Sequence, residues 1–155
     1  MDKSEAYRQL TEEIVSVVAG ETSDTARYAS AACLLTLAFR PRFFWTGFYL
    51  VDPLKPDELV VGPYQGTLGC LRIPFGKGVC GHVAATLAPV IVPDVHEFPG
   101  HIACDSASNS EIVVPVFKVD GTLAAVLDVD SAEYDAFDEI DQAGLVEICR
   151  ILLTA

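Results

Sequence analysis

Residues 111–130 have the sequence EIVVPVFKVDGTLAAVLDVD, in which two runs rich in β-branched residues flank Asp120 and Gly121. An Asp-Gly pair between two such runs is a strong signal for a β-hairpin with a two-residue loop. The predicted loop pairs Val119 with Thr122 and thereby sets the register of both strands. This hairpin is the most informative local feature of the sequence.

The predicted register brings acidic residues together. It places Val113 opposite Asp128 and Glu111 opposite Asp130. Because side chains alternate between the faces of a strand, Glu111, Asp128 and Asp130 are expected on one face. Like charges in facing positions destabilise a hairpin unless something compensates them. Two interpretations follow: the strand ends fray into solvent, or the carboxylates converge on a cation or a proton-transfer site.

The segments around the hairpin indicate an α+β fold. Helical spacing of apolar residues predicts helices at about residues 7–18, 25–38, 79–87 and 137–153. Strand-like composition predicts strands at residues 43–51, 59–64, 90–92, 112–119 and 122–130. We expect one domain over residues 1–155, with a largely antiparallel central sheet and N- and C-terminal helices packed on one face.

The composition limits the functions that the chain can have. It has 155 residues, 51% of them hydrophobic, which is enough for one sizeable core. A formal net charge of −12 and a pI near 4.4 disfavour binding to nucleic acid or to an anionic membrane surface. No apolar run approaches the roughly 20 residues that cross a bilayer. We therefore expect a soluble, cytoplasmic protein.

Five cysteines in a chain without a secretory signal do not favour a structural disulfide framework. Cys33 and Cys149 lie in apolar runs and are expected to fill the core. Cys104 instead lies in a polar stretch that is typical of a loop, and Cys70 and Cys80 precede it. A thiolate that reduces an oxidised substrate becomes a sulfenic acid, with which a second thiol can form a disulfide. This grouping therefore favours thiol redox catalysis.

A zinc site is the alternative role for these thiols. The side chains that could supply ligands to a tetrahedral zinc ion are Cys70, Cys80, His82, His96, His101 and Cys104. The sequence lacks the C-x₂-C spacing of a zinc knuckle, and Cys80 and His82 are awkwardly spaced for joint ligation on a helix. We therefore expect no bound metal.

Two further motifs suggest ligand contacts. Trp45 and Tyr49 are four residues apart and are expected on one strand face, with Gly47 leaving a gap between them. The aromatic pair either walls a slot for a ligand or packs in the core. Residues 76–82 form a glycine-rich turn into a helix, and the free N–H groups at such a helix start suit an anion such as a carboxylate.

Seven short motifs are distributed between residues 45 and 131. They are WTGFYL (45–50), GPYQG (62–66), CLRIP (70–74), GKGVCG (76–81), DVHEF (94–98), GHIACDSASNSEI (100–112) and VLDVDS (126–131). Together they resemble the free methionine-(R)-sulfoxide reductases, a catalytic branch of the GAF-domain fold. The resemblance covers about residues 43–153 and is most specific at residues 100–112.

The resemblance implies a GAF domain that reduces free L-methionine (R)-S-oxide to L-methionine, with no bound cofactor and with thioredoxin as the electron donor. Cys104 matches the nucleophile, which attacks the sulfoxide sulfur and becomes a sulfenic acid. Cys70 matches the principal resolving cysteine, and Cys80 matches an auxiliary or alternative one.

The resemblance also implies a substrate site. Glu111, Asp128 and Asp130 match carboxylates that hold the substrate ammonium and polarise or protonate the sulfoxide oxygen, while Trp45 and Tyr49 wall the methyl end. Clustering is expected to raise the pKa of at least one of these carboxyls. We expect N–H groups between residues 70 and 80 to bind the substrate carboxylate, and the terminal helices could pair two copies into a homodimer. The alternative is a non-catalytic GAF sensor of a small molecule or of oxidation.

Overall fold

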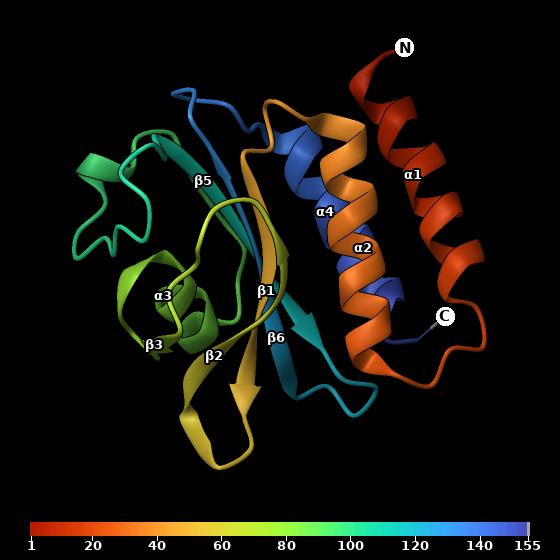
Figure 1. The fold of residues 1–155 in the computed structure, drawn as a ribbon, viewed down its shortest axis with the longest axis horizontal. Helices are drawn as coiled ribbons and strands as arrows, with labels where there is room; N and C mark the ends of the chain where they lie inside the picture. The colour runs from red at the N-terminus through yellow and green to blue at the C-terminus, as the bar shows by residue number, and fades with distance from the viewer. Residues whose placement is uncertain (155) are drawn as a thin grey trace.

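A six-stranded antiparallel sheet runs through the middle of the molecule (Figure 1). The computed structural model describes residues 1–154. The strands are β1 (Trp45–Asp52), β2 (Lys55–Gln65), β3 (Arg72–Pro74), β4 (Val90–Val92), β5 (Ser110–Phe117) and β6 (Leu123–Ser131). Their order across the sheet is β3-β2-β1-β6-β5-β4, and each neighbouring pair is antiparallel. The hairpin of β5 and β6 thus lies beside the central strand β1.

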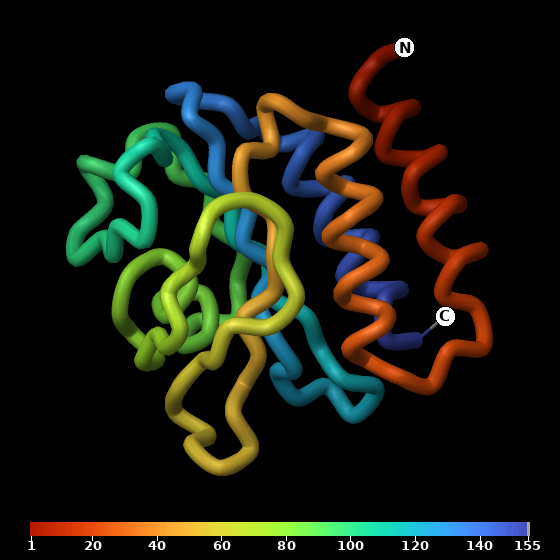
Figure 2. Tube along the Cα trace, viewed as in Figure 1, coloured from red at the N-terminus to blue at the C-terminus, as the bar shows by residue number. Residues whose placement is uncertain are grey.

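Helices cover the two faces of the sheet unequally. On one face lie α2 (Asp24–Phe39) and α4 (Glu139–Leu152), and α1 (Lys3–Val18) packs outside this pair (Figure 1). The short helix α3 (Gly78–Thr86) and long connecting loops cover the opposite face. Figure 2 shows the loops between β2 and β5 gathered on this second side, away from α1. The predicted α+β architecture, with terminal helices on one face, is confirmed.

Side-chain caps explain where two of the helices begin. The Ser23 side chain accepts a hydrogen bond from the Ala26 N–H at the start of α2. At the start of α4, Asp138 and Asp141 form a reciprocal capping box, so this helix begins at Glu139 and not at residue 137 as predicted. In the part of the chain that the structure describes, no helix is both long enough and apolar enough to span a membrane.

The β5–β6 hairpin has the predicted register. Glu111 lies opposite Asp130, and Val113 lies opposite Asp128. Because the side-chain period of a strand is two residues, the three acidic side chains share one face of the sheet. That face is the one covered by α3.

The predicted two-residue loop of this hairpin is wrong. The strands end at Phe117 and resume at Leu123, and an irregularity after Val116 shifts the pairing by one residue. The cause is a wider turn, in which the Asp120 carboxylate accepts hydrogen bonds from both the N–H and the hydroxyl of Thr122. The irregularity lies at the loop end of the ladder, so the register at the acidic end is unaffected.

Each face of the sheet has its own apolar core. The larger core joins the sheet to α1, α2 and α4, and Ile14, Leu35 and Phe48 are fully buried in it. The smaller core lies under α3 and includes Tyr49 and Val83. The strands therefore present apolar side chains on both faces, which makes three acidic residues in the second core unusual.

The prediction that Cys33 fills the core is wrong, because Cys33 is exposed. The buried residues of α2 include Tyr28, Ala31, Ala32 and Leu35, which follow the i, i+3, i+4, i+7 spacing of one helix face. Cys33 falls outside that stripe. Cys149 is buried in the larger core, as predicted.

Candidate functional site

Glu111, Asp128 and Asp130 form a carboxylate cluster on the sheet face under α3. Glu111 and Asp128 are each only 5% exposed, and Asp130 is partly buried. The strand β1 continues this face, with Gly47 opposite Asp128 and Trp45 opposite Asp130. The interpretation of these residues as frayed strand ends in solvent is therefore wrong.

Burial is the main cause that raises the pKa of all three carboxyls in the carboxylate cluster. The negative charge of Asp128 raises the pKa of Glu111 and of Asp130 further, and both lie well above their ordinary values. For Asp128, hydrogen bonds with Glu111 and Cys80 partly oppose the effect of burial. The cluster can therefore retain a proton at a pH at which solvated carboxyls have lost theirs.

Helix α3 brings Cys80 onto the carboxylate cluster. Its sulfur and one carboxylate oxygen from each of Glu111 and Asp128 all lie within 4.8 Å of one another. Burial, together with the charge of Asp128, raises the pKa of the Cys80 thiol well above its usual range. The next residue, Gly81, permits the close packing of α3, because a Cβ there would lie 2.4 Å from the Pro74 carbonyl oxygen.

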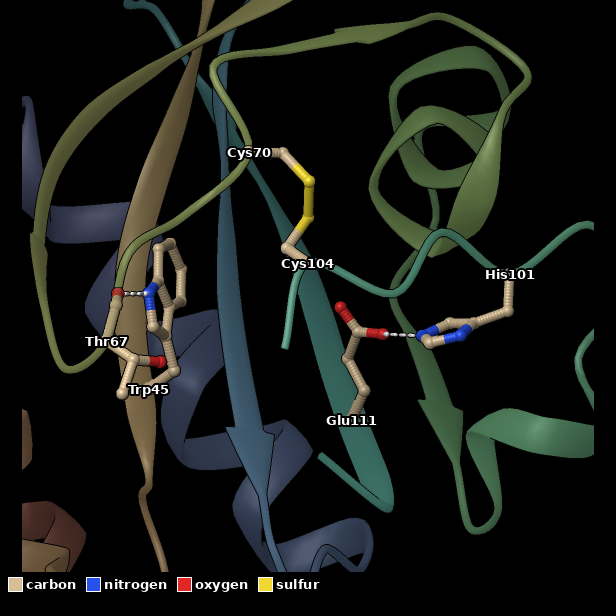
Figure 3. Close-up of a disulfide and its surroundings, with 6 residues drawn as sticks. All are labelled: Trp45, Thr67, Cys70, His101, Cys104 and Glu111. Carbon is tan, nitrogen blue, oxygen red and sulfur yellow. Dashed lines mark hydrogen bonds and ion pairs between the residues drawn. A yellow bond between two sulfur atoms is a disulfide. The ribbon is translucent and has the colours of Figure 1, made fainter. Parts of the chain in front are cut away.

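Cys70 and Cys104 form a disulfide near the carboxylate cluster (Figure 3). Their Cα atoms are 5.4 Å apart although 34 positions separate them in the sequence. Two of the six residues considered as zinc ligands are thus bonded to each other, and another, His96, contacts Asp94 at 2.8 Å on the surface. These six residues therefore do not come together as one zinc site.

Contacts that the sequence did not predict hold the loop of Cys104. The Thr67 hydroxyl donates a 2.6 Å hydrogen bond to the Asp105 carboxylate. The His101 Nε2 lies 3.7 Å from the Glu111 Oε1, and Figure 3 shows the imidazole and the carboxylate facing each other. Burial lowers the pKa of His101. In the sequence, only the polar character of the stretch around Cys104 indicates such contacts.

Trp45 and Tyr49 share a face, as predicted, but no empty slot separates them. Their rings are stacked with centroids 5.6 Å apart, and the Trp45 Nε1 donates a 2.8 Å hydrogen bond to the Thr67 carbonyl oxygen (Figure 3). The indole fills the gap left by Gly47, where a Cβ would lie 2.7 Å from the Trp45 ring and 2.3 Å from Tyr64 Cβ. The stacked pair forms one wall of a pocket.

That pocket joins all of these groups. Seven of the eight predicted site residues line it, and the eighth, Cys70, is bonded to the lining residue Cys104. Gly78 and Val79, at the start of α3, also line it, and the first N–H groups of a helix have no partner within the helix. With the disulfide formed, the volume of the pocket is about 30 Å³.

The chain is similar to several known proteins. Residues 5–155 match the family model described as GAF domain. The chain is 44% identical to the free methionine-R-sulfoxide reductase of Escherichia coli, over 96% of this chain and 87% of that protein. It is 36% identical to the free methionine-R-sulfoxide reductase of Saccharomyces cerevisiae, over 98% of this chain and 86% of that protein.

A solved structure gives a three-dimensional comparison. The free methionine-R-sulfoxide reductase of Neisseria meningitidis, in complex with its substrate, has a TM-score of 0.93 with this chain and is 50% identical to it. The match covers 99% of this chain and 89% of that one.

Proposed function

Because the chain belongs to the GAF domain family, and within it to the free methionine-R-sulfoxide reductases, we propose that it reduces free L-methionine (R)-S-oxide to L-methionine. The observation that carries this proposal is the bond between Cys70 and Cys104 beside a pocket lined by the carboxylate cluster. A disulfide in that position is the oxidised product expected of a dithiol reductase. The protein is accordingly an oxidoreductase.

In the proposed reaction, Cys104 is the nucleophile and Cys70 is the resolving cysteine. The Cys104 thiolate attacks the sulfoxide sulfur, the oxygen passes to Cys104, and methionine leaves. The Cys70 thiol then attacks the sulfur of the resulting sulfenic acid, so that a disulfide forms and water leaves. One sulfoxide is reduced and two thiols are oxidised, which balances the electrons.

The carboxylate cluster has two roles in this proposal. A carboxyl whose pKa is raised can protonate the sulfoxide oxygen near neutral pH, and Glu111 and Asp130 have the pKa values raised furthest. The remaining negative charge binds the substrate ammonium, which supplies the missing positive partner for Asp128. Activity should therefore fall as the pH rises through the raised pKa values.

The other substrate groups have candidate contacts in the same pocket. The stacked rings of Trp45 and Tyr49 would bound the methyl end, and the N–H groups of Gly78 and Val79 would bind the substrate carboxylate. Recognition of both the ammonium and the carboxylate favours the free amino acid over a methionine within a chain. We assign Cys80 an auxiliary role, because it contacts the carboxylate cluster and is not bonded to Cys104.

The disulfide has to be reduced before the next turnover. While the Cys104 sulfur is bonded to Cys70, it cannot attack a second sulfoxide. We propose thioredoxin as the reductant, no bound cofactor, and a role in the cytoplasm that reverses oxidative damage to free methionine. The terminal helices are the proposed contact of a homodimer.

A non-catalytic GAF sensor is the competing function. A sensor binds its ligand without consuming it, whereas a reductase turns over. The decisive experiment measures NADPH oxidation in the presence of thioredoxin, thioredoxin reductase and the free R epimer. The free S epimer and an N-acetylated, carboxyl-blocked R epimer serve as controls, and both should be poor substrates. Absence of stimulation by the free R epimer would contradict the reductase proposal.

A further inference from the structure

One of the two carboxylate oxygens of Asp128, the buried Oδ1, has no hydrogen-bond partner. It is one of three such side-chain atoms among the described residues, and the other two, in Thr36 and Thr46, are hydroxyl oxygens. Asp128 is 5% exposed and lines the pocket. A buried carboxylate oxygen without a donor is costly, so this atom indicates that a positively charged group can occupy the pocket.

The atoms around Asp128 form a set of metal ligands. The Cys80 sulfur and one carboxylate oxygen from each of Glu111 and Asp128 lie within 4.8 Å of one another. Tetrahedral Zn²⁺ sites have Zn–S distances of about 2.3 Å and Zn–O distances of about 2.0–2.2 Å, so modest side-chain movements would bring the three atoms around one ion.

We propose that Cys80, Glu111 and Asp128 bind a thiophilic divalent cation such as Zn²⁺, and that this cation inhibits the protein by occupying the position of the substrate ammonium. The sulfur ligand selects Zn²⁺ or Cd²⁺ over Mg²⁺ and Ca²⁺, which prefer shells made only of oxygen. Three anionic ligands also leave a fourth position for water, or for His101, which is 3.7 Å from Glu111.

Binding of the cation requires the loss of protons and no redox change. The Cys80 thiol loses its proton to the buffer as the metal–sulfur bond forms, and a protonated carboxyl in the cluster does the same. The cation replaces those protons as the neutralising charge for three groups that repel one another when ionised. This site differs from the zinc site considered from the sequence, because it uses neither Cys70 nor Cys104.

The test uses the protein with its Cys70–Cys104 disulfide intact and with the exposed Cys33 replaced by Ser, so that Cys80 and Cys149 are the remaining thiols. Cd²⁺ is titrated into this protein, and the ultraviolet charge-transfer band of a cadmium–thiolate bond is recorded. We expect one equivalent to bind, Zn²⁺ to displace it, and excess Mg²⁺ to leave it in place.

The variants identify the ligands. Cys80→Ser should abolish the band and weaken Cd²⁺ binding by roughly 100-fold or more, whereas Cys149→Ser, which removes a buried thiol in the other core, should retain both. Asp128→Asn, which retains Cys80, should also weaken Cd²⁺ binding strongly. This second variant tests the site even if Cys80→Ser does not fold. Absence of Cd²⁺ binding, or a band that survives Cys80→Ser, overturns the proposal.

Inhibition is measured separately and rests on the proposed function. Zn²⁺ should raise the KM for the free sulfoxide without changing the rate at saturating substrate. Because the cadmium titration needs no turnover, a protein that binds the metal but shows no reductase activity would contradict the proposed function and leave the metal site intact. Inhibition without competition against the substrate would contradict the proposed overlap with the ammonium position.

Discussion

The Thr67 hydroxyl and the Asp105 carboxylate form a hydrogen bond of 2.6 Å between the two loops that carry the disulfide partners. Thr67 lies shortly before Cys70 in the sequence, and Asp105 directly follows Cys104. The hydrogen bond between Thr67 and Asp105 therefore limits how far apart the sulfur atoms of Cys70 and Cys104 can move. Disulfide formation requires these two atoms to meet. Neither residue belongs to the carboxylate cluster, but the charge of Asp105 is one of the minor causes that raise the pKa of Asp130.

Replacement of Thr67 by Val should slow disulfide formation without slowing methionine release. A hydrogen bond of this kind contributes about 1 kcal/mol, which corresponds to an approximately five-fold lower rate for closure of the Cys70–Cys104 bond. Stopped-flow mixing with free sulfoxide, followed by acid quenching and mass spectrometry, separates the two steps. Thr11→Val is the matched control, because it removes a threonine hydroxyl that is bonded to the Tyr7 carbonyl on α1. Equal slowing in both variants would contradict the role of the Thr67–Asp105 bond.

The three cysteines near the pocket should behave differently in a single turnover without reductant. Cys104→Ser should release no methionine, because the nucleophile is gone. Cys70→Ser should release about one equivalent and then stop, because the sulfenic acid has lost its main partner. Cys80→Ser should still form the Cys70–Cys104 disulfide, since the Cys80 sulfur is not in that bond.

Chromatography of free methionine and mass-spectrometric mapping of disulfides distinguish these outcomes. Methionine release by Cys104→Ser would refute its assignment as nucleophile. A bond between Cys80 and Cys104 in the wild-type protein after exposure to substrate would exchange the proposed roles of Cys70 and Cys80.

Replacement of Glu111 by Gln should stabilise the protein at high pH. In the folded state the pKa of Glu111 lies well above its ordinary value of 4.5, so the folded protein retains a proton that the unfolded chain releases. Stability from this group is complete below the unfolded pKa and is lost as the pH rises through the folded pKa. Each unit of pKa shift corresponds to about 1.4 kcal/mol of unfolding free energy.

Urea unfolding of the two proteins at pH 4 and at pH 8 tests the sign of this effect. The difference in unfolding free energy should favour the Gln variant by at least about 1 kcal/mol more at pH 8 than at pH 4. Glu13→Gln, on the exposed side of α1, is the control and should show no such change. A difference that does not change with pH would show that Glu111 has an ordinary pKa in the folded protein.

The carboxylate cluster can be predicted from the sequence because one paired position in a hairpin determines the pairing of the positions that follow. Once Glu111 faces Asp130, the two-residue period of the strand places Asp128 on the same face, whatever the detailed turn. The turn itself was mispredicted, since its form depends on how the Asp120 side chain bonds to Thr122. The wrong turn therefore did not change the predicted pairing at the acidic end of the hairpin.

Other parts of the site could not be predicted, because they depend on tertiary contacts. The indole of Trp45 lies over Gly47 because Tyr64, on the neighbouring strand, stacks against it with ring centroids 5.0 Å apart. The contact between His101 and Glu111 depends on how an irregular loop crosses the sheet. Periodicity carries no information about such a loop, whereas the resemblance of its motif to a known family does.

Replacement of Gly47 by Ala should weaken substrate binding as well as stability. The new Cβ would lie 2.3 Å from Tyr64 Cβ and 2.7 Å from the Trp45 ring, so the indole has to leave its place beside Tyr49. Such overpacking costs about 1–3 kcal/mol of unfolding free energy. Displacement of the aromatic wall should raise the KM for the free sulfoxide by about two- to ten-fold.

Gly144→Ala is the matched control for this prediction, because its Cβ would lie 2.3 Å from the Tyr7 ring between α1 and α4, away from the pocket. It should lower the melting temperature while leaving the KM unchanged, since a clash of similar severity there cannot move Trp45. If both variants raise the KM equally, the effect comes from general loosening of the fold. If only Gly47→Ala raises it, the position of the indole determines substrate affinity.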